Sequence, residues 1–265
     1  MNEAIGWLWA TALGLCVGSF VNVIIHRLPA VALDPEASSW QALWQPRSHC
    51  PHCQHPLPAT HLVPVLSWLL LRGRCGFCQH PIAWRYPVVE AATGALWWLC
   101  AAQWGLGIEG LLWAVFASAL LALAWIDAQT TLLPDALTQP LLWLGLLASQ
   151  QQWLGLPLSE AVAGAMLGYA SLWLVATVFE RITGKVGMGA GDFKLLAALG
   201  AWLGPLALLP LVLLASVLGA GVGLLLQRRG VLAHGGYLPF GPFLALGAGV
   251  MVLEGPALQR VLLGP

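Results

Sequence analysis

Charged side chains are scarce in this sequence: they make up 8% of its 265 residues, whereas 59% are hydrophobic. A soluble globular domain carries roughly 25% charged residues. So small a charged fraction cannot cover a surface exposed to water, which excludes an ordinary soluble protein and indicates several membrane spans. The formal net charge is zero, and without a basic excess we expect no nucleic-acid partner.

Two further signals are missing. The first apolar segment has Glu3 as its only early charged residue and no small-residue cleavage site, so we expect a retained helix and no cleaved signal peptide. No glycine-rich strand–turn–helix motif for a nucleotide is present. The sequence therefore gives no position for a nucleotide-like cofactor.

The apolar runs that are present predict an all-α polytopic membrane protein with about eight transmembrane helices. We expect them at 4–25, 86–104, 108–126, 133–149, 159–180, 192–204, 206–227 and 238–258. The sixth run has only about 13 residues, or roughly 20 Å of helix, and is shorter than a bilayer core of about 30 Å. We expect Gly204 and Pro205 to end it.

The basic residues predict the orientation of these spans. Eight spans place ten of the eleven Lys and Arg residues on one side of the membrane, namely Arg27, Arg47, Arg72, Arg74, Arg85, Arg181, Lys185, Lys194, Arg228 and Arg229. By the positive-inside rule that side is cytoplasmic, and both termini are periplasmic. We therefore expect a first transmembrane helix over 1–25, a cytoplasmic domain over 26–85 and a seven-helix membrane domain over 86–265.

The predicted cytoplasmic domain contains two cysteine pairs, "CPHC" at 50–53 and "CGFC" at 75–78. Four thiolates at this spacing predict a structural Zn²⁺ site formed by Cys50, Cys53, Cys75 and Cys78. Such a site is closed and leaves no coordination position for catalysis. The alternatives are two disulfides, which the reducing cytoplasm disfavours, and a redox relay. Flanking histidines could replace one ligand but are expected to be solvated: His49, His52, His55 and His80.

Acidic side chains in membrane spans are costly and indicate function. Asp127 lies at the end of the third predicted span and Asp192 at the start of the sixth. Two facing carboxylates can divide the roles of acid and base. The alternative for Asp192 is a helix N-cap, and we expect the same role for Asp135. We expect Glu90 to pair with Arg85.

Several motifs resemble those of the bacterial type IV prepilin peptidases. These are "GSFVNVIIHRLP" after the first span, the two CxxC pairs followed by "RYPVVE", "DAQTTLLPD", "GMGAGDFKLL" and "PFGPFLALGA". They follow one another in order and cover nearly the whole chain. The family also has members without these cysteines, so the resemblance does not require zinc.

This resemblance implies a bifunctional enzyme of the bacterial inner membrane and an aspartic protease of the GxGD type. Such an enzyme removes the short basic leader from type IV prepilins or type II secretion pseudopilins. It then methylates the new N-terminal amine with S-adenosylmethionine. Carried over by position, the catalytic pair is Asp127 and Asp192. The three glycines before Asp192 leave room for an extended substrate.

Two other functions are compatible with parts of the sequence. A proton-coupled transporter could use Asp127 and Asp192 as relay sites, although we find no internal repeat and both acids lie at one edge of the membrane. A membrane-anchored redox or metal protein centred on the CxxC pairs would leave the two aspartate motifs unexplained.

Overall fold

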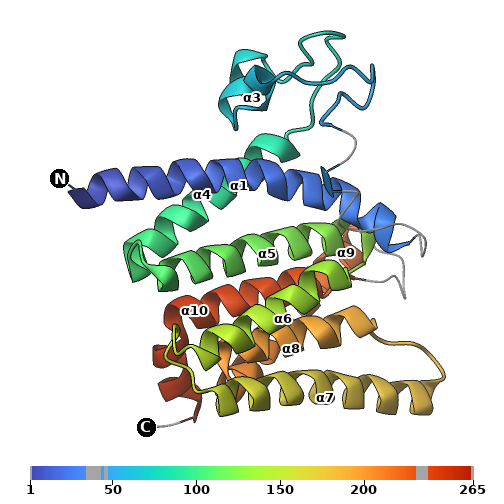
Figure 1. The fold of residues 1–265 in the computed structure, drawn as a ribbon. Helices are drawn as coiled ribbons and strands as arrows, with labels where there is room; N and C mark the ends of the chain where they lie inside the picture. Colours follow the sequence, from blue (N-terminus) through green and yellow to red (C-terminus); the bar gives the residue numbers. More distant parts are fainter. Residues whose placement is uncertain (1, 34–42, 45–46, 231–237, 264–265) are drawn as a thin grey trace. The chain divides into compact units, whose positions relative to one another are not determined.

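The computed structural model describes residues 2–33, 43–44, 47–230 and 238–263 (Figure 1). Within these ranges the chain is helical, and its only β-type pairings are two isolated bridges, His49 with Pro56 and Arg74 with Pro81. The chain divides into two compact units, residues 1–122 and 123–265. Helix α5 (Ile108–Thr130) crosses the division between them.

The first unit is built on a close pair of helices, α1 (Asn2–Ala32) and α4 (Arg85–Trp104), with η1 (Ala59–Leu62) and α3 (Leu66–Leu70) between them in sequence. A Cβ atom on Gly14 would lie 2.6 Å from the Cβ atom of Trp97, and one on Gly18 would lie 2.7 Å from the Cα atom of Glu90. The glycines therefore let two antiparallel backbones approach closely, as in other membrane helix pairs.

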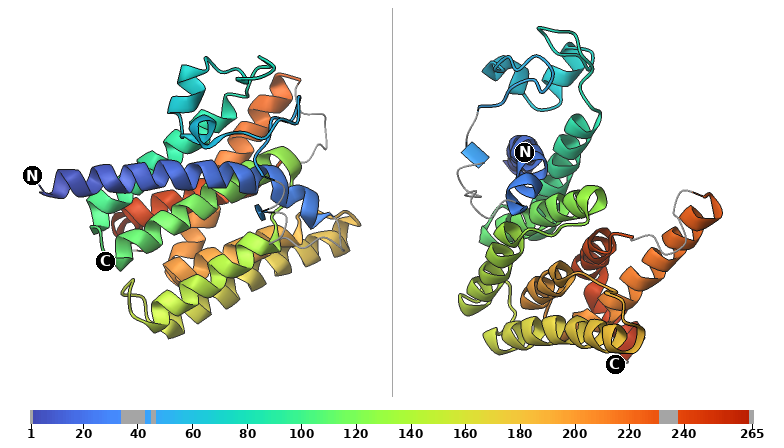
Figure 2. Two further views of the ribbon diagram at one scale, coloured as in Figure 1. Left: turned by 45° about the horizontal axis from the view of Figure 1, so that its top comes forward. Right: turned by 90° about the vertical axis from the view of Figure 1, so that its right-hand side faces the viewer.

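The second unit contains the remaining helices: α6 (Asp135–Gln150), α7 (Leu158–Thr183), α8 (Ala190–Leu203), η2 (Pro205–Ala207), α9 (Leu208–Arg228) and α10 (Gly241–Leu263). Helix α7 lies alongside α8 (Figure 2), where Gly164 packs against the backbone of Gly200. The indole N–H of Trp202 in α8 donates to the carbonyl of Leu141 in α6 over 2.8 Å. Helix α8 is thereby held between α6 and α7.

Eight helices of 14 residues or more in the described chain lie at the positions of the eight predicted runs. Four of them are long and apolar enough to cross a membrane: Glu3–Ala32, Ile108–Thr130, Leu158–Thr183 and Pro205–Arg228. The short sixth run is confirmed, because α8 has 14 residues and ends at Gly204, whose φ is 77°. Helix α1 continues to Ala32, beyond the predicted end at residue 25.

The Glu90 carboxylate, which was expected to pair with Arg85, has two donors from other parts of the first unit. The Glu90 carboxylate is buried in α4 and accepts a hydrogen bond from the backbone N–H of Val65 at 2.7 Å. The Ser19 hydroxyl on α1 is a second donor to it. This carboxylate therefore fastens the segment before α3 to the α1–α4 pair.

Candidate active site and metal centre

The four cysteines of the two CxxC pairs converge in the first unit. The sulfur atoms of Cys50, Cys53, Cys75 and Cys78 all lie within 4.8 Å of one another, and those of Cys50 and Cys78 are 3.8 Å apart. A tetrahedron of thiolates at the usual Zn–S distance of about 2.3 Å has S–S edges of about 3.8 Å. All six cysteines of the chain are free thiols. The cluster thus has the donors and the size to hold a tetrahedral metal ion.

The cluster is formed by two copies of one backbone turn. In each copy the backbone N–H of the first cysteine donates to the backbone carbonyl of the histidine five positions later. The distance is 3.0 Å from Cys50 to His55 and 2.9 Å from Cys75 to His80. The glutamine after each second cysteine has a positive φ, 58° at Gln54 and 59° at Gln79. The repeated sequence C-x-x-C-Q-H-P, at 50–56 and 75–81, encodes this turn twice, and it is a signal that the cysteine spacing alone does not convey.

The thiols of the cluster have different surroundings. A backbone N–H of His80 lowers the pKa of Cys78, but burial and the neighbouring thiols raise it to about 11, whereas the backbone favours the thiolate of Cys75. Backbone N–H groups of Cys78 and Phe77 donate to the sulfur of Cys75 and lower the pKa of that thiol to about 7. The loop histidines form ring contacts, with His52 stacked on His80 at 4.2 Å between ring centroids. Among the described residues the metal-ligand group contains only the four cysteines, as expected for a closed site.

Asp127 lies in the last turn of α5, in the second unit, and is 4% exposed. Its Oδ2 accepts a hydrogen bond of 2.8 Å from the backbone N–H of Gly241, the first residue of α10. The N–H groups of a first helical turn have no partner within the helix and favour an anion. A Cβ atom on Gly241 would lie 2.8 Å from the same Oδ2, so only glycine fits here without displacement.

Asp192 is the third residue of α8, whose N-cap is Gly189. Asp192 is therefore not the N-cap residue itself, although its carboxylate accepts a hydrogen bond from the backbone N–H of Gly189. Its Oδ1 is buried and has no hydrogen-bond partner in the described part of the chain. Because a buried polar atom without a partner is costly, this oxygen is a candidate for chemistry.

Both aspartates line one cavity of about 720 Å³ within the second unit, and their carboxylates act on each other electrostatically. The other lining residues come from the end of α5, from the Asp192 motif, from α9 and from the chain before α10: Thr131, Val186, Gly187, Met188, Gly189, Ser216, Gly219, Ala220, Gly223, Leu224, Gln227, Leu238, Pro239 and Phe240. Asp127 and Asp192 are the only acids among them. The structure thus brings together the two carboxylates that the sequence singled out.

The glycines before Asp192 differ in their surroundings. A Cβ atom on Gly191 would lie 2.8 Å from the Cβ atom of Leu133, so this glycine permits a close approach of the chain that follows α5. Gly189 lines the cavity, and a Cβ atom there would approach nothing closer than 3.9 Å, the distance to Oδ2 of Asp192. A Cβ atom on Gly187 would lie 2.7 Å from the ring of Phe179, so of the three glycines only Gly189 leaves open space at the cavity.

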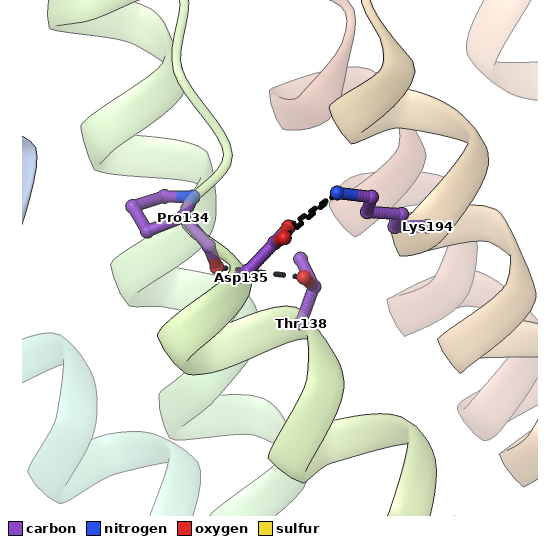
Figure 3. Close-up of polar contacts among 4 residues, drawn as sticks. All are labelled: Pro134, Asp135, Thr138 and Lys194. Atoms are coloured by element: carbon purple, nitrogen blue, oxygen red, sulfur yellow. Dashed lines mark hydrogen bonds and ion pairs between the residues drawn. The ribbon is translucent and has the colours of Figure 1, made fainter. Parts of the chain in front are cut away.

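The expected role of Asp135 as an N-cap is also wrong. Pro134 is the N-cap of α6, and Asp135 is the first residue of the helix. Instead, the ammonium of Lys194 lies 2.8 Å from both carboxylate oxygens of Asp135 (Figure 3). This ion pair joins α6 to α8 and engages the basic residue that stands two positions after Asp192.

Comparisons with known proteins cover both units. The model of the Bacterial Peptidase A24 N-terminal domain matches residues 12–104, and that of the Type IV leader peptidase family matches residues 114–224. Three relatives are each named prepilin leader peptidase/N-methyltransferase. The one from Stutzerimonas stutzeri is 43% identical over 94% of this chain and 90% of its own length. The relative from Aeromonas hydrophila is 45% identical over 98% and 96%, and that from Neisseria gonorrhoeae is 40% identical over 95% and 91%. No solved structure matches the chain significantly.

Proposed function

Because the chain belongs to the type IV leader peptidase family, we propose that it is a prepilin leader peptidase and N-methyltransferase. It removes the basic leader from type IV prepilins or type II secretion pseudopilins and then methylates the new N-terminal amine. The observation that carries the peptidase half is the cavity that Asp127 and Asp192 share. The relatives named for both activities support the methyltransferase half.

The surroundings of the two carboxylates support different roles for them. The N–H of Gly241 stabilises the anion of Asp127, so Asp127 is the base that takes a proton from the attacking water. Asp192 has an oxygen without a partner and holds the proton that goes to the carbonyl oxygen of the scissile bond. The resulting tetrahedral diol returns a proton to Asp192 as its C–N bond breaks, and the amine leaves with the proton held by Asp127.

The position of the pair fits a substrate that is partly embedded in the membrane. Asp127 ends one apolar helix and Asp192 begins another, so eight spans place both at the cytoplasmic face of the bacterial inner membrane, with both termini periplasmic. A basic leader is then held in the cytoplasm, and the apolar helix that follows the scissile bond stays in lipid. The cytoplasmic domain covers 26–85 and the membrane peptidase domain covers 86–265.

The cysteine cluster has a structural role. Cys50, Cys53, Cys75 and Cys78 hold one Zn²⁺, which would lock the two turns of the cytoplasmic domain together. Four protein ligands close the coordination sphere, so the metal stands outside the hydrolysis. The methyl donor is S-adenosylmethionine, which supplies an activated methyl group to the free amine. None of the described residues is assigned to binding S-adenosylmethionine.

The direct test is to incubate the purified protein in detergent with a prepilin and S-adenosylmethionine. We expect a shortened pilin that carries one added methyl group. An intact prepilin after incubation with folded, membrane-extracted protein would overturn the proposal. A proton-coupled transporter or a CxxC redox protein would leave the prepilin uncut, and neither function is favoured by the relatives.

A further inference from the structure

Helix α3 exposes a row of leucines although it lies outside every predicted span. Leu66, Leu69 and Leu70 are 58%, 57% and 83% exposed, and their i, i+3, i+4 spacing places them on one face of the helix. On the inner side, Trp68 is half-buried and donates its indole N–H to the carbonyl of Ile82 over 3.3 Å. The leucine face is therefore the outer surface of an ordered helix.

The level of α3 along the membrane follows from the hydrogen bond between Val65 and Glu90. Val65 directly precedes α3, and its N–H lies 2.7 Å from the Glu90 carboxylate in α4. Glu90 stands 14 positions before the end of α4 at Trp104, or about 21 Å along the helix axis. This is within a bilayer core of about 30 Å. With α4 taken as the second predicted span, helix α3 begins at the depth of the cytoplasmic leaflet. Figures 1 and 2 show α3 in the segment that joins α1 to α4.

The backbone at Val65 fixes the course of the chain into α3. Val65 has φ of 60° and ψ of −50°, a conformation that costs free energy for a β-branched residue. Such a backbone conformation persists only where neighbouring contacts stabilise it. Here the stabilising contact is the hydrogen bond from the Val65 N–H to the Glu90 carboxylate. A side chain from a membrane helix thus sets the place where α3 starts.

We propose that residues 62–70 are a monotopic membrane anchor, with Leu66, Leu69 and Leu70 inserted at the acyl boundary of the cytoplasmic leaflet. The partner is the lipid surface, because Glu90 in the second predicted span holds the start of this exposed leucine face. Two exposed cations, Arg72 and Arg74, follow directly and match the phosphate of anionic headgroups. The anchor holds the cysteine domain against the bilayer and is independent of the peptidase reaction.

The test uses the full-length protein in bilayer discs of phosphatidylethanolamine and phosphatidylglycerol. A photoreactive benzoylphenylalanine replaces Leu70 in one variant and Leu69 in a second, and lipid adducts are quantified by mass spectrometry after irradiation. The matched control places the same group at Gln54, which is exposed in the first cysteine turn of the same domain. We expect several-fold more lipid adduct at positions 69 and 70 than at position 54.

Zinc content serves as the folding control, because only a folded cysteine domain holds the metal. A variant is compared only if its zinc content equals that of the unlabelled protein. Lipid adducts at both leucine positions that are no more frequent than at Gln54 would overturn the proposal. So would cross-links from both positions that go chiefly to protein, whether to a second copy of this chain or to an added prepilin, because the leucine face would then be a protein interface.

Discussion

Glu90 in the first unit and Asp192 in the second are both carboxylates near the end of an apolar helix, yet their surroundings differ. Glu90 accepts hydrogen bonds from the Val65 N–H and the Ser19 hydroxyl. Asp192 accepts a hydrogen bond from the backbone N–H of Gly189, but one of its oxygens is buried without a hydrogen-bond partner among the described residues, and the side chain lies on a cavity. A carboxylate whose hydrogen bonds are satisfied holds structure together, whereas one with an unused oxygen beside a cavity is available for chemistry.

Asp127 has both a strongly hydrogen-bonded oxygen and a position on the cavity. One of its oxygens is held by the N–H of Gly241, while the side chain still lines the cavity. The comparison therefore predicts a graded set of responses. Loss of Asp127 or Asp192 affects the reaction itself, loss of a group that orients Asp127 affects it less, and loss of Glu90 affects mainly stability.

The largest effect is expected from Asp127→Asn and Asp192→Asn. An amide can neither take a proton from water nor deliver one to a carbonyl oxygen, so either change should lower the rate of prepilin cleavage by roughly 10²–10⁴-fold or more. Cleavage is followed by the mobility of the pilin on gels. Asp135→Asn is the control, because an exposed ion pair contributes only about 0–1 kcal/mol and cleavage should stay near wild type. If either dyad variant keeps the wild-type rate, that aspartate has no part in the reaction.

The next effect concerns Gly241. An added methyl group would lie 2.8 Å from Oδ2 of Asp127, so Gly241→Ala displaces the N–H that stabilises the anion. Loss of a hydrogen bond to a charged group costs about 1.5–3 kcal/mol, which corresponds to a rate lower by roughly 10–150-fold. The control is Gly249→Ala in the same helix, where no atom lies within 4 Å of the added carbon. Equal cleavage rates for the two variants would show that Gly241 does not act on the dyad.

The cysteine cluster should respond through metal content. Wild-type protein should carry about one zinc per chain, and Cys75→Ser should release most of it, as measured by elemental analysis of protein purified without chelator. Cleavage should fall less than in the aspartate variants, because a closed site takes no part in the hydrolysis. Cys16→Ser is the control, since Cys16 lies in α1 away from the cluster. Wild-type protein without metal would refute the assignment.

The smallest effect on cleavage is expected at Glu90. Glu90→Leu leaves the partly buried N–H of Val65 without its acceptor and should lower the free energy of unfolding by about 1–3 kcal/mol. Glu90→Gln keeps an acceptor oxygen and should lie close to wild type. Thermal unfolding in detergent measures the stability, and cleavage at a temperature where both variants are folded should differ little. A loss of cleavage in Glu90→Gln as large as that in Asp192→Asn would remove the distinction between the two carboxylates.

Local patterns in the sequence predicted the helices and the cysteine cluster, because each depends on residues near one another in the chain. Apolar runs gave the positions of the helices, and Gly204 with Pro205 gave the end of α8. The hydrogen-bond and ion-pair partners of the carboxylates could not be predicted from the sequence. Lys194 is 59 positions from Asp135, and Gly241 is 114 positions from Asp127. These contacts arise only when helices pack, and no local periodicity encodes them.

The predicted role of Asp135 failed for the same reason. Asp135 has the local context of an N-cap, but the ammonium of Lys194 offers its carboxylate a charged partner that a capping N–H cannot match. Glu90 has a basic neighbour five positions earlier, but its donor Val65 lies 25 positions away, in the segment before α3. Only the tertiary arrangement decides which of several nearby donors a carboxylate accepts.

The central claim is that Asp127 and Asp192 form the hydrolytic pair, and one measurement tests it most directly. Purified Asp192→Asn is incubated with labelled S-adenosylmethionine and either full-length prepilin or pilin whose leader has already been removed, beside the wild type. Methyl transfer needs only a positioned neutral amine, so label should appear on the pre-cleaved pilin and show that the variant is folded. The full-length prepilin should keep its leader and remain unlabelled. Leader removal by this variant at the wild-type rate would contradict the account.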